Sequence, residues 1–226
     1  MSAALLWLAL TLALYAAARW LHRRFPRPWL SPLLVVPVVM VAGLLALHVP
    51  YPAYMKGGRW LLDLLGPTTV AFAVPLYRHR ALLRRHAVEV AAGVATGCTV
   101  AVLSSVALAR WIGLPELVAR SMATRSITTP LAMVAAGTLG AAPALAAVFV
   151  VVTGVVGAVV GALLVHRLPL RSPIARGALL GMGAHGAGTQ RAMELGPVEG
   201  TIASLVMIVA GLTVVVVAPL IAPWLG

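Results

Sequence analysis

Two short segments inside apolar stretches of the chain combine a proline with a pair of threonines. They are Gly66-Pro67-Thr68-Thr69 and Arg125-Ser126-Ile127-Thr128-Thr129-Pro130. Proline interrupts a helix, serine and threonine hydroxyls donate hydrogen bonds, and the N-terminus of a helix that restarts at such a break attracts an anion. The two segments therefore predict a binding site for a small carboxylate. Its candidate residues are Thr68, Thr69, Arg125, Ser126, Thr128 and Thr129.

Each of these side chains also has a purely structural interpretation, and both interpretations stay open. Threonine hydroxyls at a proline break can satisfy backbone groups that the break leaves unpaired in a membrane helix. Arg125 is either a counter-ion for the substrate carboxylate or an interfacial arginine that extends toward water. The segment Thr128-Thr129-Pro130 predicts the N-cap and first turn of a half-helix at Leu131, and Pro67 predicts a similar start.

A third irregular segment covers residues 181–188, where four glycines surround Ala184-His185. Each interior glycine weakens a helix by about 1 kcal/mol, so this run predicts another interruption. His185 is a candidate for coupling proton and substrate movement, and a histidine that bonds only to the backbone is the alternative. Thr189 and Gln190 are further candidate substrate contacts. No His, Cys or Asp lies at ligand spacing from His185, so no metal site is expected.

Glu194 and Glu199 flank Gly196-Pro197 and are the other candidates for ion coupling. Carboxylates within membrane segments commonly carry protons or cations. In the alternative interpretation they cap the last apolar run and pair with Arg191. We expect no bound cofactor, with H⁺ or Na⁺ as the coupling ion. Phosphate loops and the serine elbow of hydrolases are absent from the sequence, so neither catalytic residues nor an enzyme is predicted.

The composition indicates that these segments lie in a lipid bilayer. The chain is 62% hydrophobic and 10% charged, with a mean hydropathy of +1.02, whereas soluble domains carry about 25% charged residues. We expect an all-α polytopic membrane protein with about six to eight transmembrane segments. A single membrane domain over 1–226 would comprise N-terminal spans (1–110) and a half with re-entrant segments (111–226). The apolar runs are 3–21, 30–48, 60–77, 87–109, 115–140, 143–165, 174–190 and 201–223.

The net charge of +12 does not indicate a nucleic-acid partner, because the arginines stand at the ends of the apolar runs. This is the positive-inside pattern, and it tests the topology. With the N-terminus outside and 115–140 crossing fully, eight of the counted basic residues lie inside and six outside. If 115–140 enters and returns on one side, Arg167, Arg171 and Arg176 move inside and the numbers become 11 and 3. The second arrangement is therefore expected.

The run 115–140 is accordingly predicted to be a re-entrant segment, with two halves that are each too short to span. The glycine-rich run 174–190 is predicted to re-enter from the other side. Two opposed re-entrant segments separated by one span form an inverted repeat, and transporters of that kind bind their substrate at the broken helices. We expect Thr68, Thr128 and His185 to converge at such a site.

Four segments resemble the signatures of the LrgB/CidB family of membrane proteins, and the resemblance covers roughly residues 50–225. The segments are Leu65 to Tyr77, Arg125-Ser126-Ile127-Thr128-Thr129-Pro130-Leu131-Ala132-Met133, Ser172-Pro173-Ile174-Ala175-Arg176-Gly177, and the set His185, Gly188-Thr189, Ala192, Glu194-Leu195-Gly196 and Glu199-Gly200. The chain departs from the family pattern at Arg125, where lysine is common, and at Ala203-Ser204. These departures bear on the choice of substrate.

The resemblance implies a multi-pass protein of the bacterial cytoplasmic (inner) membrane, usually paired with a small LrgA-like membrane subunit. The family was named antiholin-like for modulating murein hydrolase activity and cell lysis, whereas a similar plastid protein moves glycolate and glycerate, and bacterial members are linked to pyruvate. Two functions stay open. The broken segments favour a transporter or exporter of small monocarboxylates. The family name favours a lysis regulator acting as a homo-oligomer or with its partner subunit, and Gly157 and Gly161 form a G-x-x-x-G pair that suits either oligomers or internal helix packing.

Overall fold

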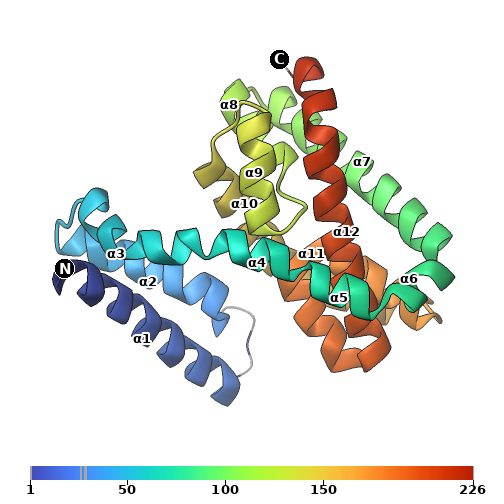
Figure 1. Ribbon diagram of the computed structural model, residues 1–226, viewed down its shortest axis with the longest axis horizontal. Helices are drawn as coiled ribbons and strands as arrows, with labels where there is room; N and C mark the ends of the chain where they lie inside the picture. Colours follow the sequence, from blue (N-terminus) through green and yellow to red (C-terminus); the bar gives the residue numbers. More distant parts are fainter. Residues whose placement is uncertain (1, 26, 28–29, 226) are drawn as a thin grey trace. The chain divides into compact units, whose positions relative to one another are not determined.

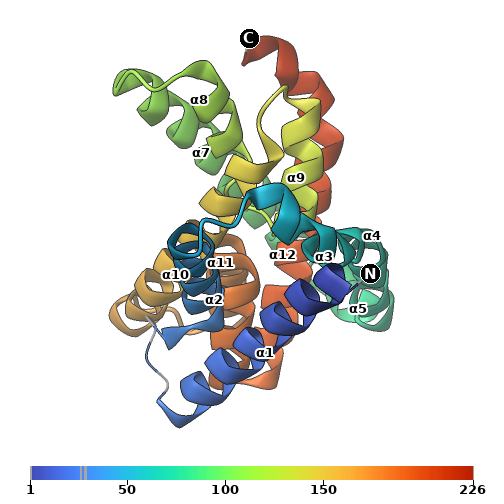
Figure 2. The ribbon, with the colours of Figure 1, turned by 90° about the vertical axis from the view of Figure 1, so that its left-hand side faces the viewer.

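A computed structural model describes residues 2–25, 27 and 30–225, and all regular secondary structure in these ranges is helical (Figures 1 and 2). The expected all-α class is confirmed. The helices are α1 (Ser2–Arg24), α2 (Pro32–Ala46), α3 (Tyr51–Asp63), α4 (Leu65–Ala71), α5 (Ala73–Arg78), α6 (Arg80–Arg85), α7 (Ala87–Trp111), α8 (Glu116–Ala123), α9 (Thr129–Thr138), α10 (Pro143–Arg167), α11 (Pro173–Leu195), α12 (Pro197–Ile221) and the 3-10 helix η2 (Ala222–Trp224).

Five stretches within the described ranges are long and apolar enough to cross a membrane, compared with the six to eight expected segments. Helix α2 is also apolar but has only 15 residues. The expected runs 115–140 and 174–190 correspond to α8 with α9 and to α11, which are broken. A polytopic membrane protein with discontinuous helices is therefore confirmed. The five stretches are Ala4–Arg24, Tyr51–Arg78, Ala87–Trp111, Pro143–Arg167 and Pro197–Trp224.

The chain forms two compact units, Met1–Val70 and Ala71–Gly226. Thr68 and Thr69 belong to the first unit, and the other candidate residues belong to the second. The single membrane domain expected over the whole chain, with halves that meet near residue 110, stays a prediction.

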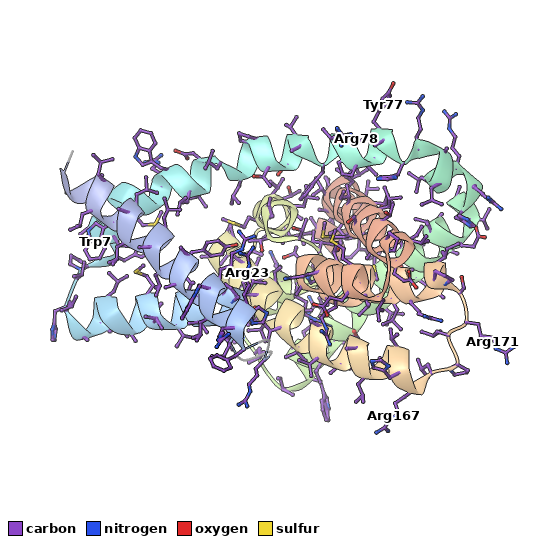
Figure 3. All side chains as sticks on the ribbon, turned by 90° about the horizontal axis from the view of Figure 1, so that it is seen from below. Trp7, Arg23, Tyr77, Arg78, Arg167 and Arg171 are labelled. Atoms are coloured by element: carbon purple, nitrogen blue, oxygen red, sulfur yellow. The ribbon has the colours of Figure 1, made fainter. Side chains whose placement is uncertain are left out.

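In the first unit, α1 packs against α3 through small and aromatic residues. Gly57 lies against the backbone of Ala4 and Leu8, so a side chain at position 57 would collide with α1. The rings of Trp7 and Tyr54 meet edge to face with their centroids 6.0 Å apart, and Figure 3 labels Trp7 on α1. Close approach of this kind is how helices associate in lipid, where packing rather than release of water supplies the attraction.

Helix α12 is the central helix of the second unit and packs against α7, α9 and α11 (Figure 1). Its side chains Ile202, Leu205 and Ile208 are almost completely buried. Ile127 and Leu131 belong to the core cluster that includes Ile202. The break between α8 and α9 therefore lies inside the packed unit and not on its surface.

Helices α8 and α9 form a hairpin whose two ends lie together. Helix α8 ends at Ala123, and α9 begins after its N-cap Thr128, with proline in its first turn as expected. After α9 the chain returns to α8, because the backbone N–H of Ala142 donates to Ser121 Oγ at 3.1 Å and Gly140 lies beside the guanidinium of Arg120. The segment enters and leaves at the same end of the unit.

Helix α11 is also two half-helices that fold back on each other. The break is at His185, whose φ of 46° and ψ of −122° are not helical. Gly188 lies directly against the backbone of Leu180, whereas residues eight apart in a straight helix are separated by about 12 Å. The ion pair between Arg176 and Glu199, at 3.8 Å, brings the start of α11 to the start of α12. The 23 residues of α11 therefore do not separate its two ends.

The two hairpins lie at opposite ends of α10. The first hairpin is bonded to Ala142 at the start of α10. In the second hairpin, Leu180 and Arg191 both line a cavity beside Ala162 and His166, near the end of α10. Since α10 is 25 residues long, about 37 Å separate its ends. This is the expected arrangement of two opposed re-entrant segments with one span between them.

Glycines allow α11 to approach both neighbouring helices. Gly157 of α10 lies against the carbonyl oxygen of Gly183, and Gly161 lies against the side chain of Leu180. On the other side of α11, a side-chain carbon at Gly181 would stand 2.7 Å from Ala203 Cα on α12. The G-x-x-x-G pair is thus used for packing inside one chain.

Cysteine labelling is expected to find both ends of each hairpin on one face of the membrane. Cys98 is the only cysteine and is buried, so a Cys98→Ala background supports single-cysteine variants at exposed positions. An impermeant maleimide should label Ile112→Cys and Pro143→Cys from one face, and Arg171→Cys and Val198→Cys from the other. If Ile112→Cys and Pro143→Cys react from opposite faces, residues 115–140 cross the membrane.

Candidate functional site

Arg125 stands at the turn between α8 and α9 and is held by α7. Its Nε donates to Ser105 Oγ at 2.6 Å, and the Ser105 hydroxyl donates to the carbonyl of Ala101. Ser105 is buried and Arg125 is half-buried. Within the described residues, the two terminal amino groups of Arg125 make no hydrogen bond or ion pair. This geometry leaves the guanidinium fixed at one edge and its other donors available for a carboxylate, which arginine can bind through two parallel hydrogen bonds.

His185 lies at the turn of the other hairpin and meets the first one. Its side chain is 3% exposed. Its ring interacts with the backbone of Ser126 through a hydrogen bond and with Arg125 through the charge of the guanidinium. The Nε2 atom is buried and has no hydrogen-bond partner among the described residues. Buried polar atoms are nearly always paired. An unpaired ring nitrogen beside a free guanidinium therefore marks a place for a ligand or a water molecule.

The backbone of His185 is itself unusual, because a positive φ is rare for residues other than glycine, asparagine and aspartate. Such conformations cost about 1–3 kcal/mol and persist where the surrounding structure enforces them, often at ligand sites. The buried Thr189 contributes to this enforcement, because its hydroxyl donates to the carbonyl of His185 at 2.9 Å. Thr189 thus supports the break, whereas the neighbouring Gln190 is exposed.

The N-terminus of α9 contributes further donors beside the turn. Thr128 is the N-cap residue, with φ of −66° and ψ of 144°, but its side chain makes no capping hydrogen bond. The hydroxyls of Thr128 and Thr129 form no hydrogen bond within the described part of the chain, and both residues are half-buried. Ser126 is 9% exposed. The first turn of α9 therefore supplies unused hydroxyls at the positive end of a helix dipole.

Thr68 and Thr69 make only local contacts in α4. Their hydroxyls donate to the carbonyls of Leu64 and Leu65, both at 2.8 Å, which agrees with the structural interpretation. Helix α4 begins at Leu65 and not at Pro67, because a proline fits the first turn of a helix, whose N–H groups have no partner in any case. The expected convergence of Thr68 with Thr128 and His185 joins the two units and stays a prediction.

Comparison with known proteins places the whole arrangement in one family. The model of the LrgB-like family matches residues 11–224. The chain belongs to the LrgB-like family. It is 44% identical over 212 residues to the uncharacterized protein YwbG of Bacillus subtilis, covering 94% of both chains. It is 30% identical over 218 residues to the holin-like protein CidB of Staphylococcus aureus, covering 96% of this chain and 95% of CidB. No solved structure matches.

The two carboxylates proposed for ion coupling differ in this LrgB-like protein. Glu194 is exposed and pairs with Arg191. Glu199 is 7% exposed, lies in the first turn of α12 and pairs with Arg176. Of the two carboxylates, only Glu194 therefore pairs with Arg191, as the alternative interpretation expected for both. Glu199 is the buried one of the two, held by a single ion pair at 3.8 Å.

The sequence alone indicates no role for Ser105, although this serine positions Arg125. The only signal in the sequence is a serine in an apolar helix, and many such serines simply bond to their own helix. Among the described residues, no group of three or more His, Cys, Asp or Glu is placed to hold a metal ion.

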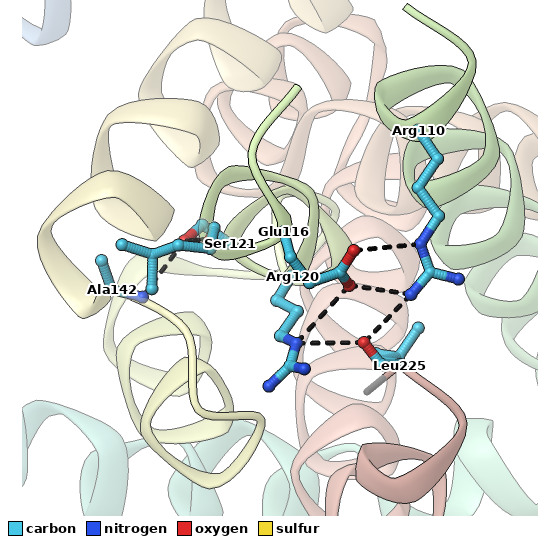
Figure 4. Close-up of polar contacts among 7 residues, drawn as sticks. Arg110, Glu116, Arg120, Ser121, Ala142 and Leu225 are labelled. Carbon is cyan, nitrogen blue, oxygen red and sulfur yellow. Dashed lines mark hydrogen bonds and ion pairs between the residues drawn. The ribbon is translucent and has the colours of Figure 1, made fainter. Parts of the chain in front are cut away.

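A cluster of charges ties the C-terminal segment to the first hairpin (Figure 4). Arg110 Nη2 lies 2.7 Å from Glu116 and donates to the carbonyl of Leu225 at 3.0 Å. Arg120 Nε donates to the same carbonyl at 3.0 Å and lies 3.5 Å from Glu116. These bonds connect the end of α7, the start of α8 and the residue after η2, so they fix the end of the hairpin that is remote from His185.

The cluster is expected to weaken in acid. Arg110 holds the pKa of the Glu116 carboxyl below its ordinary value. A carboxyl with a lowered pKa stabilises the fold above its unfolded-state pKa, near 4.3, and loses this contribution as the pH falls through the folded-state value. Between about pH 6 and about pH 3, the melting temperature of the wild type should fall further than that of Glu116→Gln. Equal decreases in the two proteins would contradict a stabilising role for Glu116.

Proposed function

We propose that this multi-pass membrane protein transports or exports small monocarboxylates of the glycolate, glycerate or pyruvate class. The substrate carboxylate binds between the tips of the two opposed hairpins. These tips are the turn at Arg125, between α8 and α9, and the turn at His185, within α11. The observation that carries the proposal is the buried, unpartnered Nε2 of His185 next to an arginine whose terminal amino groups are unused. A monocarboxylate supplies one negative charge and two acceptor oxygens, which match the amino groups of Arg125 and, once the ring carries a second proton, the Nε2–H of His185.

Three features of the site support a carrier. Irregular backbone at bilayer depth is tolerated where it lines a cavity, and discontinuous helices in opposed hairpins are typical of transporter binding sites. The N-terminus of α9, at Thr128, adds positive potential without a second buried charge. The fixed Arg125 provides the counter-ion. The proposal needs no catalytic residue, bound cofactor or nucleic acid.

Coupling to H⁺ or Na⁺ is assigned to His185 and Glu199, with Glu194 as an exposed third candidate. We further propose that the end of the second unit near the second hairpin faces the cytoplasm. Arg167 and Arg171 point away from the helices at this end (Figure 3), and basic residues are enriched in cytoplasmic loops. In a bacterial cytoplasmic membrane this orientation puts the N-terminus outside when the 15-residue helix α2 crosses as a sixth span.

A second candidate function is that of an antiholin-like regulator of murein hydrolase activity and cell lysis. The observation in its favour is the relation to CidB, which is described as holin-like. Such a regulator would act as a homo-oligomer or with a small LrgA-like subunit. The packing of Gly157 and Gly161 against α11 removes one argument for this function, because the pair is occupied inside the chain.

Uptake of labelled glycolate, glycerate and pyruvate into proteoliposomes separates the two functions. We expect saturable flux that depends on the protein and responds to an imposed pH or Na⁺ gradient. Protein-free liposomes and liposomes with an unrelated membrane protein are the controls. Absence of flux for all three acids, with protein that is monodisperse and correctly inserted, would contradict transport and favour the regulator.

Thr129→Ala is expected to impair transport more than assembly. The Thr129 hydroxyl bonds to no described residue, so its removal costs the fold little, whereas loss of one hydrogen bond to a charged ligand costs about 1.5–3 kcal/mol. Initial uptake rates should therefore fall about tenfold or more, with an unchanged elution profile in detergent. Equal losses of transport and of folded protein would instead indicate that Thr129 maintains the helix.

A further inference from the structure

A cavity separate from the hairpin tips lies between the end of α10 and both halves of α11. Its volume is about 210 Å³. Both apolar and polar side chains line it. The apolar lining is Ala162, Val165, Leu180 and Leu195, and the polar lining is His166, Arg191 and Glu194.

The position of this cavity along α10 corresponds to the surface of the bilayer. Helix α10 is a candidate span that ends with His166 and Arg167. Basic residues at the end of a span stand at the level of the lipid head groups. An occupant of this cavity would therefore have its polar part at the membrane surface and its apolar part along the spanning helix.

One positive and one negative side chain line the cavity, and the two are neighbours. Arg191 Nη1 pairs with Glu194, and the side chains of the two residues are 49% and 54% exposed. The other donors of Arg191 and the ring of His166 can bind an anionic phosphate, while Glu194 can accept hydrogen bonds from an ammonium group. A polyanionic head group would be repelled by Glu194, and a head group without a cation would leave this carboxylate with Arg191 as its only partner.

We propose that the cavity binds the zwitterionic head group of a phospholipid with a primary amine, of the phosphatidylethanolamine type. The phosphate lies against Arg191 and His166, and the ammonium donates to Glu194. A quaternary choline ammonium has no N–H to donate, so phosphatidylcholine loses the contact with Glu194. The apolar wall formed by Val165 and Leu180 receives the start of the acyl chains.

The lipid would connect a fixed helix to the second hairpin. Arg191 and Glu194 belong to the half of α11 that follows His185 and Thr189. A bound head group would therefore hold this half of α11 against α10. The proposal concerns a lipid site and is independent of the carboxylate site.

Native mass spectrometry of the protein released from nanodiscs tests the site. In nanodiscs that contain equal parts of phosphatidylcholine, phosphatidylethanolamine and phosphatidylglycerol, we expect selective retention of phosphatidylethanolamine. Arg191→Ala and Glu194→Gln should each weaken this retention about tenfold. Arg171→Ala is the matched control, because Arg171 is an exposed arginine at the same end of the unit that does not line the cavity; it should change nothing.

Any of three results of the retention measurement would overturn the proposal. These are no preference among the lipids, a preference for phosphatidylglycerol, and equal retention by the wild type and both cavity variants. Free phosphoethanolamine serves as a second probe that distinguishes the source of the head group. If it competes fully at millimolar concentration, the cavity is a site for a soluble zwitterion and not for a lipid. If it fails to compete, the lipid anchoring in the proposal is supported.

Discussion

Replacement of Arg125 by alanine is expected to reduce carboxylate uptake about a hundredfold while leaving the protein folded. The charge of the guanidinium acts on the ring of His185, and its terminal amino groups are unpaired within the described residues. Two charge-assisted hydrogen bonds to a carboxylate contribute about 3 kcal/mol or more in total, which corresponds to a change in kcat/KM of at least about a hundredfold. Uptake into proteoliposomes measures this change directly.

The fold should tolerate Arg125→Ala because the variant removes a half-buried charge and no ion pair. Ser105 keeps its hydrogen bond to Ala101. Arg125→Lys keeps the charge but loses the planar fork, so uptake should lie between those of the wild type and the alanine variant. Arg171→Ala, at an exposed arginine in the connection to α11, is the matched control and should transport normally. Normal uptake by Arg125→Ala would remove Arg125 from the binding site.

Variants of Ser105 test, in the same uptake experiment, whether this serine acts by positioning Arg125. Since Ser105 Oγ holds Arg125 Nε at 2.6 Å, Ser105→Ala should raise KM for the carboxylate with a smaller change in maximal rate. Ser105→Thr keeps the hydroxyl and should restore KM. A purely structural serine would not give this pattern, because both variants would then alter the melting temperature and not KM.

Capping residues, prolines and glycines in the sequence were sufficient to predict the helix breaks of the second unit. Thr128 and Pro130 favour an N-cap and a first turn, and α9 begins where they indicate. The glycines around His185 weaken a helix, and the helix is broken at this residue. Such signals are local, because caps, prolines and glycines act on backbone groups within one turn. Counting basic residues then predicted that residues 115–140 return to the side from which they enter, and the glycine-rich run predicted the same for residues 174–190.

Long-range pairs could not be predicted in the same way. Arg176 pairs with Glu199, and Arg125 with Ser105, only because two hairpins fold back and pack against α12 and α7. Nothing in the spacing of these residues distinguishes them from other polar residues in apolar helices. The φ of 46° at His185 is likewise a result of packing, because its intrinsic preference is unfavourable. The positions of the two helix breaks in the candidate site could therefore be predicted from the sequence. The long-range contacts that hold the site together could be identified only from the folded structure.

Gly181→Ala is expected to destabilise the second unit by about 2 kcal/mol, within the range typical of overpacked cores. The added carbon would stand 2.7 Å from Ala203 Cα and 2.9 Å from its carbonyl carbon. Backbone atoms cannot move aside by changing a rotamer, so α11 and α12 must separate. The melting temperature of the purified protein in detergent should fall by roughly 5 °C, because 1 kcal/mol corresponds to about 2–4 °C in proteins of this size.

Gly183→Ala supplies a matched control on the same half of α11. A side-chain carbon at Gly183 would meet no atom within 4 Å, and alanine favours a helix over glycine by about 1 kcal/mol. Its melting temperature should therefore be equal to that of the wild type or higher. Equal melting temperatures for Gly181→Ala and Gly183→Ala would contradict the close packing of α11 on α12. Because that packing fixes the half-helix that ends at His185, Gly181→Ala should also lower uptake, whereas Gly183→Ala should leave it unchanged.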